Sequence, residues 1–316
     1  MENKVVTVTI NPAIDQTVAV PNFAAGTVNR VKYFQMDAGG KAINVASNLT
    51  DYGVPCIATG FLGNENDEIF IRFFVRKGIE DRFVRIAGQT RTGIKIIDEV
   101  SRRTTDINFP GEQPTPADIE ALFTILDELA LENEWFVLAG SLPGGVSPEI
   151  YFDMVKALSG RKVALDTSGV GFRTALPAGP WLVKPNIDEL QELVGAALET
   201  PAAILSAGRE IGQRYGIPSV VVSMGKEGAI FIEGEQAVWA APPEVEVTST
   251  VGAGDAMVAG IVAGKLDGLK LVDCARLATA FSMSAITHIG SGFPSRQEVE
   301  QGMEQVTIRE ISHERS

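Results

Sequence analysis

Thr248-Ser-Thr-Val-Gly-Ala-Gly-Asp-Ala-Met-Val-Ala-Gly260 is the stretch from which the fold is most readily deduced, because it predicts a strand, a glycine turn and a helix in direct succession. Gly252 and Gly254 can adopt backbone conformations that are closed to other residues. If the helix begins near Asp255, the amides of residues 251–255 point outward at its positive end. Such a helix start binds an anion, for example a phosphate or a phosphoryl group in transfer.

Asp255 has two interpretations at this helix start. A carboxylate near a helix N-terminus has its charged form favoured, so Asp255 is either a simple helix cap or a base held ready for proton transfer. Taken alone, the cap is the commoner role of an aspartate in this position. The motif by itself leaves both roles open.

The rest of the chain alternates short β-branched runs with longer amphipathic segments. This alternation is typical of an α/β layer fold, in which helices cover a parallel sheet. We expect buried strands at 5–9, 57–61, 135–139, 162–166, 181–184 and 219–223. We expect helices at 42–52, 116–131, 148–158, 187–194, 201–215, 255–266 and 271–287. The 316 residues are enough for one large domain with a small appendage.

Two stretches, 16–36 and 93–109, interrupt the alternation. The second contains two short strand patterns around a polar turn. Because an isolated hairpin is only marginally stable in water, we expect the two stretches to pair into a small sheet that could close a cleft of the main domain. Edge strands on the main sheet are the alternative.

The composition excludes several classes of function. Hydrophobic residues make up 45% of the chain and charged residues 21%, which is typical of a folded globular protein. Lysine and arginine number 27 against 40 acidic residues, so a net charge of −13 should repel nucleic acids and anionic membranes. No apolar stretch approaches the roughly 20 residues needed to cross a bilayer, and the N-terminus lacks a signal-peptide pattern. We therefore expect a cytoplasmic protein with no nucleic-acid and no membrane partner.

Cysteine and histidine are scarce. Cys56 and Cys274 with His288 and His313 are too few for a disulfide framework or a structural zinc site. The chain also contains no P-loop pattern, dinucleotide fingerprint, metalloprotease motif or nucleophile elbow. These absences weaken a hydrolase assignment and leave oxygen atoms as the candidate metal ligands.

A second glycine pair, Gly39-Gly40, precedes a helical pattern that begins with Lys41. Asn44 lies on the first turn, away from the apolar stripe, and could offer a donor and an acceptor to a polyol. Lys41 could bind a phosphate. For both residues the alternative is an ordinary surface position on a helix.

Polar side chains follow two other predicted strands. Asp15 lies just past the first strand, at the carboxyl end where open α/β sheets bind ligands, and could accept hydrogen bonds from vicinal hydroxyls; an Asx turn is the alternative. Lys184, Asn186 and Glu189 follow the strand at 181–184 and could hold a metal–nucleotide. Mg²⁺ keeps most of its water ligands, so the last two residues would act through water. A helix-capping arrangement of Asn186 and Glu189 is the alternative.

Six cations gather in or beside the expected small sheet, although the chain as a whole is acidic: Arg30, Lys32, Arg91, Lys95, Arg102 and Arg103. A positive patch over a cleft would attract an anionic substrate. Most of these charges are expected to be merely solvated. Arg91 and Arg30 are the candidates for binding a phosphate.

Together, these residues resemble the ribokinase-like, PfkB-type family of carbohydrate kinases across essentially the whole chain. The two motifs of that family are matched by Gly39-Gly-Lys-Ala-Ile-Asn-Val-Ala46 and Ser249-Thr-Val-Gly-Ala-Gly-Asp-Ala-Met-Val258. Their order and separation make the match specific. Residues 9–15, 106–109, 140–148 and 181–186 are most similar to members that phosphorylate fructose 1-phosphate. Members that phosphorylate tagatose 6-phosphate are similar over the same span, and the lead-in Ser249-Thr250-Val251 favours the former.

The resemblance implies a three-layer, doubly wound, mostly parallel α/β sheet with a small β-sheet lid. The main domain would comprise residues 1–12, 39–90 and 110–316, and the lid residues 13–38 and 91–109. Such lids are often shared between two subunits, which implies a homodimer. ATP with Mg²⁺ would be the phosphoryl donor, and lid closure would exclude water.

The resemblance also implies roles for individual residues. Asp255 matches the catalytic base, and the anion hole is matched by Gly252, Ala253 and Gly254. The sugar-phosphate pocket is matched by Asp15, Gly39, Gly40, Lys41, Asn44, Arg91 and Ser141. The ATP site is matched by Lys184, Asn186, Ser223, Gly225, Gly228, Thr250, Gly252 and Gly254, with Asn186 and Glu189 near the magnesium.

These roles imply transfer of the γ-phosphoryl group of ATP to the C6 hydroxyl of fructose 1-phosphate, with Asp255 taking the proton. A depressed pKa of Asp255 would be tolerable if the proton moves late. Ala42 replaces the glycine usual in the family and is expected to place a methyl group close to the sugar. The alternatives are a tagatose 6-phosphate, fructose 6-phosphate or unphosphorylated sugar or nucleoside substrate, or a sugar-phosphate sensor without catalysis.

Overall fold

The computed structural model describes residues 4–101, 103–244, 252–287 and 293–311. In this part of the chain the main sheet consists of β1 (Val5–Thr9), β4 (Cys56–Gly63), β5 (Glu80–Asp81), β6 (Val84–Ile86), β9 (Trp135–Ala139), β10 (Lys162–Asp166), β11 (Leu182–Val183), β12 (Ser219–Ser223), β13 (Ala229–Glu233), β14 (Gln236–Ala241) and β15 (Thr307–Glu310). The strand order is β15-β14-β13-β12-β11-β10-β9-β1-β4-β5, and β6 pairs with β4. From β12 to β5 every pairing is parallel. The strands β13, β14 and β15 add an antiparallel edge.

Helices cover both faces of the main sheet. One face carries α1 (Lys41–Asp51), α2 (Glu68–Lys77), α8 (Ala253–Leu266), α9 (Leu271–Thr287) and α10 (Arg296–Met303). The other carries α3 (Pro116–Ala130), α4 (Ile150–Ala157), α5 (Gly169–Ala175), α6 (Ile187–Val194) and α7 (Pro201–Tyr215), with the 3₁₀ turns η1 (Leu176–Ala178) and η2 (Gly225–Glu227) in connections. Side chains of β1 alternate between the two cores, because Val5 packs in the first while Val6 and Val8 pack in the second. The three layers of the expected fold are therefore present.

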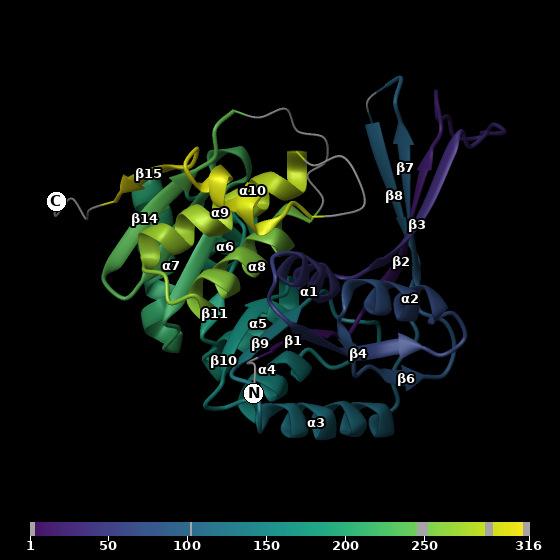
Figure 1. Ribbon diagram of the computed structural model, residues 1–316, viewed down its shortest axis with the longest axis horizontal. Helices are drawn as coiled ribbons and strands as arrows, with labels where there is room; N and C mark the ends of the chain where they lie inside the picture. The colour runs from purple at the N-terminus through teal and green to yellow at the C-terminus, as the bar shows by residue number, and fades with distance from the viewer. Residues whose placement is uncertain (1–3, 102, 245–251, 288–292, 312–316) are drawn as a thin grey trace.

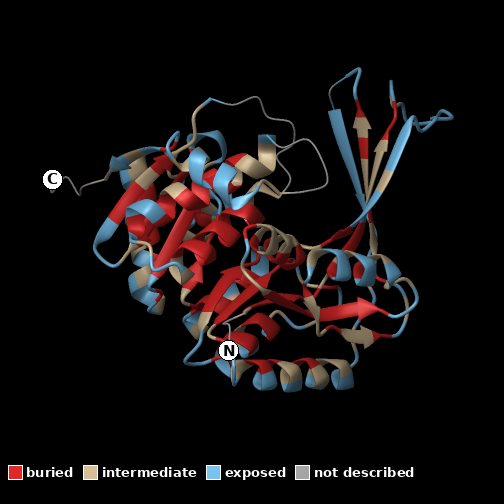
Figure 2. Cartoon of the chain, in the orientation of Figure 1, coloured by how far each residue is buried: buried red, intermediate tan, exposed pale blue. Residues whose placement is uncertain are grey.

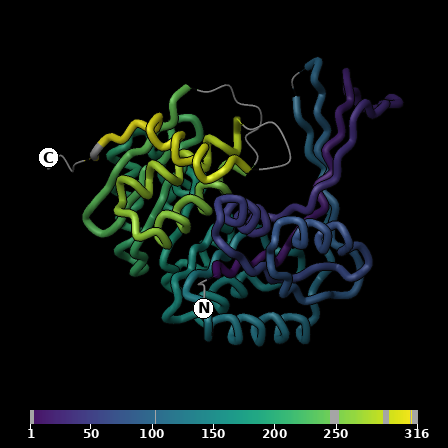
Figure 3. Tube along the Cα trace, viewed as in Figure 1, coloured from purple at the N-terminus to yellow at the C-terminus, as the bar shows by residue number. Residues whose placement is uncertain are grey.

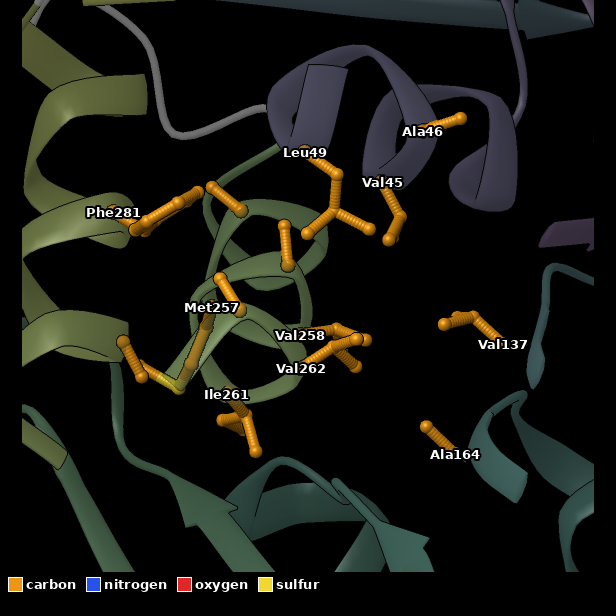
Figure 4. Close-up of a cluster of buried hydrophobic side chains, with 14 of the residues drawn as sticks. Val45, Ala46, Leu49, Val137, Ala164, Met257, Val258, Ile261, Val262 and Phe281 are labelled. Atoms are coloured by element: carbon orange, nitrogen blue, oxygen red, sulfur yellow. The ribbon is translucent and has the colours of Figure 1, made fainter. Parts of the chain in front are cut away.

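The first core brings together elements from distant parts of the sequence. Figure 4 shows Leu49 of α1, Val258 of α8 and Phe281 of α9 meeting there, with Val137 of β9 on the sheet side. Two glycines of α8 pack closely on α9. A β-carbon on Gly260 would lie 2.6 Å from the Cα of Ala278, and one on Gly264 would lie 3.0 Å from Sγ of Cys274. The packing of α8 against α1 and α9 fixes where its N-terminal turn lies.

A separate small sheet consists of β2 (Ala13–Ala19), β3 (Tyr33–Gly39), β7 (Thr92–Asp98) and β8 (Arg103–Asn108), in the order β3-β2-β7-β8. It is built from two stretches of chain far apart in the sequence and projects from the main body (Figures 1 and 3). The expectation of a separate sheet is confirmed, and the alternative of edge strands on the main sheet is not realised. Much of its surface is exposed (Figure 2).

The register gives the small sheet two different faces. Asp15 stands opposite Asp37 on one side and Gly93 on the other, and Lys95 stands opposite Asp106. These residues share a polar face. The other face is mainly apolar, because strand residues alternate in direction, and it carries Val18, Phe34, Ile94, Ile96 and Ile107.

All six expected main-sheet strands are present, with the strand at 181–184 reduced to its central two residues. The expected helices are also present, and α8 starts at Ala253, two residues before the expected start. The expectations omitted α2, α5, α10 and the antiparallel edge. None of the described helices is long and apolar enough to span a membrane.

Candidate functional site

The glycine turn before α8 has the backbone conformation that its sequence suggests. Gly252 is the N-cap of α8 and has a φ of 79°, in the left-handed region that favours glycine. Among the described residues no side chain caps this helix start. The Asp255 carboxylate instead accepts a hydrogen bond from Nδ2 of Asn44, at 2.8 Å. The starts of α1 and α8, distant in the sequence, therefore meet at one site.

Asp255 is deeply buried, with 6% of its surface exposed. Burial raises the pKa of Asp255 to about 6, and the negative charge of Asp166 acts in the same direction. The hydrogen bond from Asn44 and the charges of Lys41 and Lys184 only partly oppose this rise. The expectation of a depressed pKa is therefore wrong, because loss of hydration is the largest influence on this carboxylate.

Asp166, at the end of β10, lies between two lysines. Its carboxylate is 3.6 Å from Nζ of Lys41 and 3.4 Å from Nζ of Lys184. The Lys184 ammonium also lies against the first turn of α8, since a β-carbon on Gly254 would be 3.3 Å from Nζ. Sequence reasoning missed Asp166, although it ends a predicted buried strand at the edge where α/β sheets bind ligands.

Asp15 lies where the small sheet joins the main body. A β-carbon on Gly39 would come within 2.1 Å of its Oδ2 atom, and one on Gly93 within 3.2 Å of Oδ1. Asp15 is exposed in a single chain, yet partial loss of hydration raises its pKa, while the charges of Lys95 and Arg91 lower it. Gly39 is two residues from Lys41, so the carboxylate of Asp15 belongs to the same region as the start of α1.

Arg91 and Ser141 are linked through a residue that sequence reasoning did not single out. Nε of Arg91 donates to Oδ1 of Asn11 at 3.0 Å, and Nδ2 of Asn11 donates to Oγ of Ser141 at 3.0 Å. Burial lowers the pKa of Arg91, and nearby Asp15 raises it. Asn11 follows β1 directly, so its place at the carboxyl end of a parallel strand was the available signal.

Lys95 of β7 also acts on Asp15, and the remaining described cations near the small sheet do not. Arg30 is exposed in the connection between β2 and β3, which is at the opposite end of these strands from Asp15. Lys32 pairs with Glu99 on the surface. Arg103 is exposed, and Arg102 lies outside the described residues. Among the described residues, Arg91 is therefore the arginine whose charge acts on Asp15.

The residues expected around a nucleotide follow β11 and β12. Asn186 and Glu189 form a capping box at the start of α6. The backbone N–H of Asn186 donates to the Glu189 carboxylate at 2.9 Å, and the backbone N–H of Glu189 donates to Oδ1 of Asn186 at 2.8 Å. Asn186 also bridges to Ser223 at the end of β12. In this structure Asn186 and Glu189 therefore act as helix-capping residues, which was the alternative expected from the sequence.

Glycines shape the loop after β12. Gly225 opens the turn η2 with a φ of 59°. Gly228 closes it with a φ of 87°, and a β-carbon there would lie 2.0 Å from the carbonyl oxygen of Ala240. The backbone at Gly228 therefore packs so closely on the backbone of β14 that only glycine fits there. Thr250, also expected at the nucleotide, lies outside the described residues.

Ala42 does not line the site. Its side chain is fully buried, with 0% exposed, and packs in the core beneath α1. Lys41 and Asn44, three residues apart, occupy the face of α1 that meets Asp166 and Asp255. The expectation that Ala42 places a methyl group close to the sugar is therefore wrong, because the helix turns that methyl toward the hydrophobic core.

Comparison with known proteins places the chain in a family. Residues 2–298 match the pfkB family of carbohydrate kinases. The 1-phosphofructokinase of Rhodobacter capsulatus is 43% identical over 98% of this chain and 99% of its own length. The crystal structure of a possible 1-phosphofructokinase from Thermotoga maritima is 27% identical and superimposes with a TM-score of 0.88, covering 98% of this chain and 100% of the other. Phosphofructokinase-2 of Escherichia coli in complex with fructose-6-phosphate is 26% identical with a TM-score of 0.85, over 96% and 98%. The chain belongs to the pfkB family of carbohydrate kinases.

Proposed function

We propose that this phosphotransferase is a 1-phosphofructokinase, which transfers the γ-phosphoryl group of ATP to the C6 hydroxyl of fructose 1-phosphate and releases fructose 1,6-bisphosphate and ADP. The observation that carries the proposal is the hydrogen bond between Asn44 and Asp255, which joins the starts of α1 and α8. The Asp255 carboxylate is buried there, near Lys41 and Lys184. The 1-phosphofructokinase of Rhodobacter capsulatus, at 43% identity, supports this choice of substrate.

In this proposal Asp255 is the general base. With a pKa of about 6 it is mostly ionised at neutral pH, yet it is a stronger base than an ordinary aspartate. The Asn44 amide holds one carboxylate oxygen, which orients the other toward the acceptor hydroxyl. Phosphoryl transfer also requires stabilisation of charge on the equatorial oxygens. The amides of residues 252–254 are assigned this role, and one such donor is typically worth about 3 kcal/mol.

Lys41 and Lys184 both lie near Asp255, and we assign one to each substrate. Lys184 directly follows β11 and precedes Asn186 by two residues, so we assign it to the phosphates of ATP. The loop that holds Ser223, Gly225 and Gly228 and the residue Thr250 are assigned to the same phosphates. Lys41 follows the glycine pair Gly39-Gly40 and is assigned to the sugar-phosphate side. Both ammoniums attract anions, which brings two negatively charged substrates to an otherwise acidic chain.

Magnesium suits this set of residues only if substrate and water supply most of its ligands. Among the described residues there is no group of three or more carboxylate, histidine or cysteine side chains that could hold a metal. Mg²⁺ is commonly bound in this way, through phosphates and waters, with one or two protein oxygens. Asn186 and Glu189 would hold its waters, and the ion would neutralise charge on the ATP phosphates.

Asp15, Arg91 and Ser141 are assigned to the sugar phosphate. The Asp15 carboxylate would accept hydrogen bonds from sugar hydroxyls, and the Arg91 guanidinium would bind the 1-phosphate. The small sheet, residues 13–38 and 91–109, would then act as a lid over the main domain formed by residues 1–12, 39–90 and 110–316. Closing it would exclude water, which competes with the sugar for the phosphoryl group.

The apolar face of the lid supports a homodimer. Phe34 is 52% exposed and Ile107 45% exposed on this face, in a single chain. A sheet with one open apolar face is commonly covered by another copy. Sedimentation equilibrium should therefore find a dimer that the double variant Phe34→Glu/Ile107→Glu dissociates. The cytoplasmic location remains a prediction.

A substrate panel tests the proposed function. We expect kcat/KM with ATP to be higher for fructose 1-phosphate than for fructose 6-phosphate, tagatose 6-phosphate or fructose. A preference for either 6-phosphate would assign the chain to the corresponding alternative. Binding of sugar phosphate without any product, measured by calorimetry and a coupled assay, would instead support a non-catalytic sensor.

A further inference from the structure

The proposed mechanism leaves Asp166 without a role, although it is among the most buried charged groups of the site. Only 3% of its surface is exposed. Its Oδ2 atom has no hydrogen-bond partner among the described residues, so ion pairing is what compensates the loss of water. The two ions come from opposite sides: Lys41 from α1 and Lys184 from the end of β11.

The carboxylate favours the charged form of one of these lysines. Burial alone would lower the pKa of Lys41, but the negative charges of Asp166, Asp255 and Glu189 outweigh it and raise that pKa. Of these groups, Asp166 contributes most. Without it, two ammoniums would face each other across the start of α8 with only Asp255 between them.

The charges around Asp255 can be counted within the described residues. Lys41 faces it from α1, Asp166 from β10 and Lys184 from the end of β11. The face of α9 packed against α8 is largely apolar and holds Cys274, Ala275, Leu277, Ala278 and Phe281. With Asp255 ionised, these groups carry two positive and two negative charges, and Glu189 of α6 adds a negative charge that acts on Lys41.

We propose that Asp166 is a positioning residue for phosphoryl transfer, a shared counter-ion that holds the Lys41 and Lys184 ammoniums on either side of the reacting groups. This inference rests on the proposed function and deepens it. In this role the carboxylate acts through the two lysines and not directly on a substrate. It fixes the positions of the two ammonium groups, which could otherwise reorient toward the phosphate of either substrate.

Two consequences separate this role from a purely structural one. In Asp166→Asn both lysines remain, so attraction for the anionic substrates persists, but the cations lose their common anchor. A misplacement of about 1 Å can cost on the order of 100-fold in rate. Removing the negative charge next to Asp255 also lowers the pKa of the base, since Asp166 is one of the groups that raise it.

The experiment compares wild type, Asp166→Asn and the control Asp127→Asn, which removes an exposed carboxylate from α3. We expect Asp166→Asn to lower kcat by roughly 10- to 100-fold, with KM for ATP and fructose 1-phosphate changed less than about threefold. The acidic limb of its pH–kcat/KM profile should move down by on the order of one pH unit. The control should match wild type.

An unmoved acidic limb, a loss that falls on KM alone, or full recovery at raised Mg²⁺ would each overturn the inference. If Asp166→Asn does not fold, judged by circular dichroism, Asp166→Glu keeps the charge and displaces it. It should then lower kcat while leaving the acidic limb near that of wild type, and a normal kcat would refute the positioning role. Inactive wild type with every acceptor would mark failure of the proposed function instead.

Discussion

Replacing the base by its neutral isostere, Asp255→Asn, should stabilise the protein while it stops the reaction. The folded-state pKa of Asp255 is raised to about 6 from an ordinary value of 3.8. A group with a raised folded pKa binds its proton more tightly in the folded state, so stability is lost as the pH rises from the unfolded pKa to the folded one. The difference is about two pKa units, and at roughly 1.4 kcal/mol per unit this amounts to about 3 kcal/mol at pH 7.

The assay is urea unfolding of wild type, Asp255→Asn and the exposed control Asp127→Asn at pH 7 and pH 4. We expect Asp255→Asn to gain up to about 3 kcal/mol over wild type at pH 7 and almost nothing near pH 4, where the aspartate is protonated in the folded state. The gain should build up as the pH rises from about 4 to about 6 and stay constant above that, because the unfolded chain ionises before the folded one. The amide oxygen that this substitution introduces can still accept the hydrogen bond from Asn44, so the site should keep its shape.

Activity should change in the opposite direction. Wild-type kcat/KM should fall as the pH drops through about 6, because the protonated carboxyl cannot accept the hydroxyl proton. Asp255→Asn should lose several powers of ten in kcat while calorimetry still detects binding of ATP and fructose 1-phosphate. Equal stability of the two proteins at pH 7, or a variant within tenfold of the wild-type rate, would refute this account of the buried base.

Two further substitutions test the small sheet. Gly39→Ala should push the Asp15 carboxylate aside, because the added β-carbon would lie 2.1 Å from its Oδ2 atom. Asp15 is an exposed side chain that can move, so stability should change little while KM for the sugar phosphate rises. The control Gly302→Ala, which adds an ordinary 3.6 Å contact on α10, should stay like wild type. Asp98→Ala should loosen the outer end of the sheet, because this carboxylate accepts hydrogen bonds from the amides of residues 22, 23 and 100. Hydrogen exchange at those amides should then quicken with the main domain unchanged, and unaltered protection would contradict the anchoring role.

Much of the fold follows from local patterns. The buried parallel strands are short apolar runs, and the helices between them have regular apolar stripes, so both were predictable. The omitted α2 is different, because Ile71 and Val75 are exposed beside buried Phe70 and Phe74, and this obscures its stripe. The antiparallel edge depends on a two-residue connection between β13 and β14 that contains Gly234. That turn signal was present in the sequence.

The site was predictable in its members but not in its electrostatics. The glycine motifs located both helix starts, and the contact between Asn44 and Asp255 fits that expectation. The sign of the pKa shift of Asp255 could not be obtained in the same way, since it depends on how deeply α1, β10 and β11 bury the carboxylate. Asp166 was missed for a related reason, because its importance comes from two lysines that approach from distant parts of the chain.

The parallel pairing of β2 with β7 constrains how the nascent chain can fold. The β2–β3 hairpin leaves the ribosome early, but its neighbour in the sheet is made only after β4, α2 and the following strands. Until then the hairpin has an unpaired strand edge and an exposed apolar face, and chains in this state are prone to aggregate. During synthesis, this appendage rather than the central layers should be the part that most needs a chaperone.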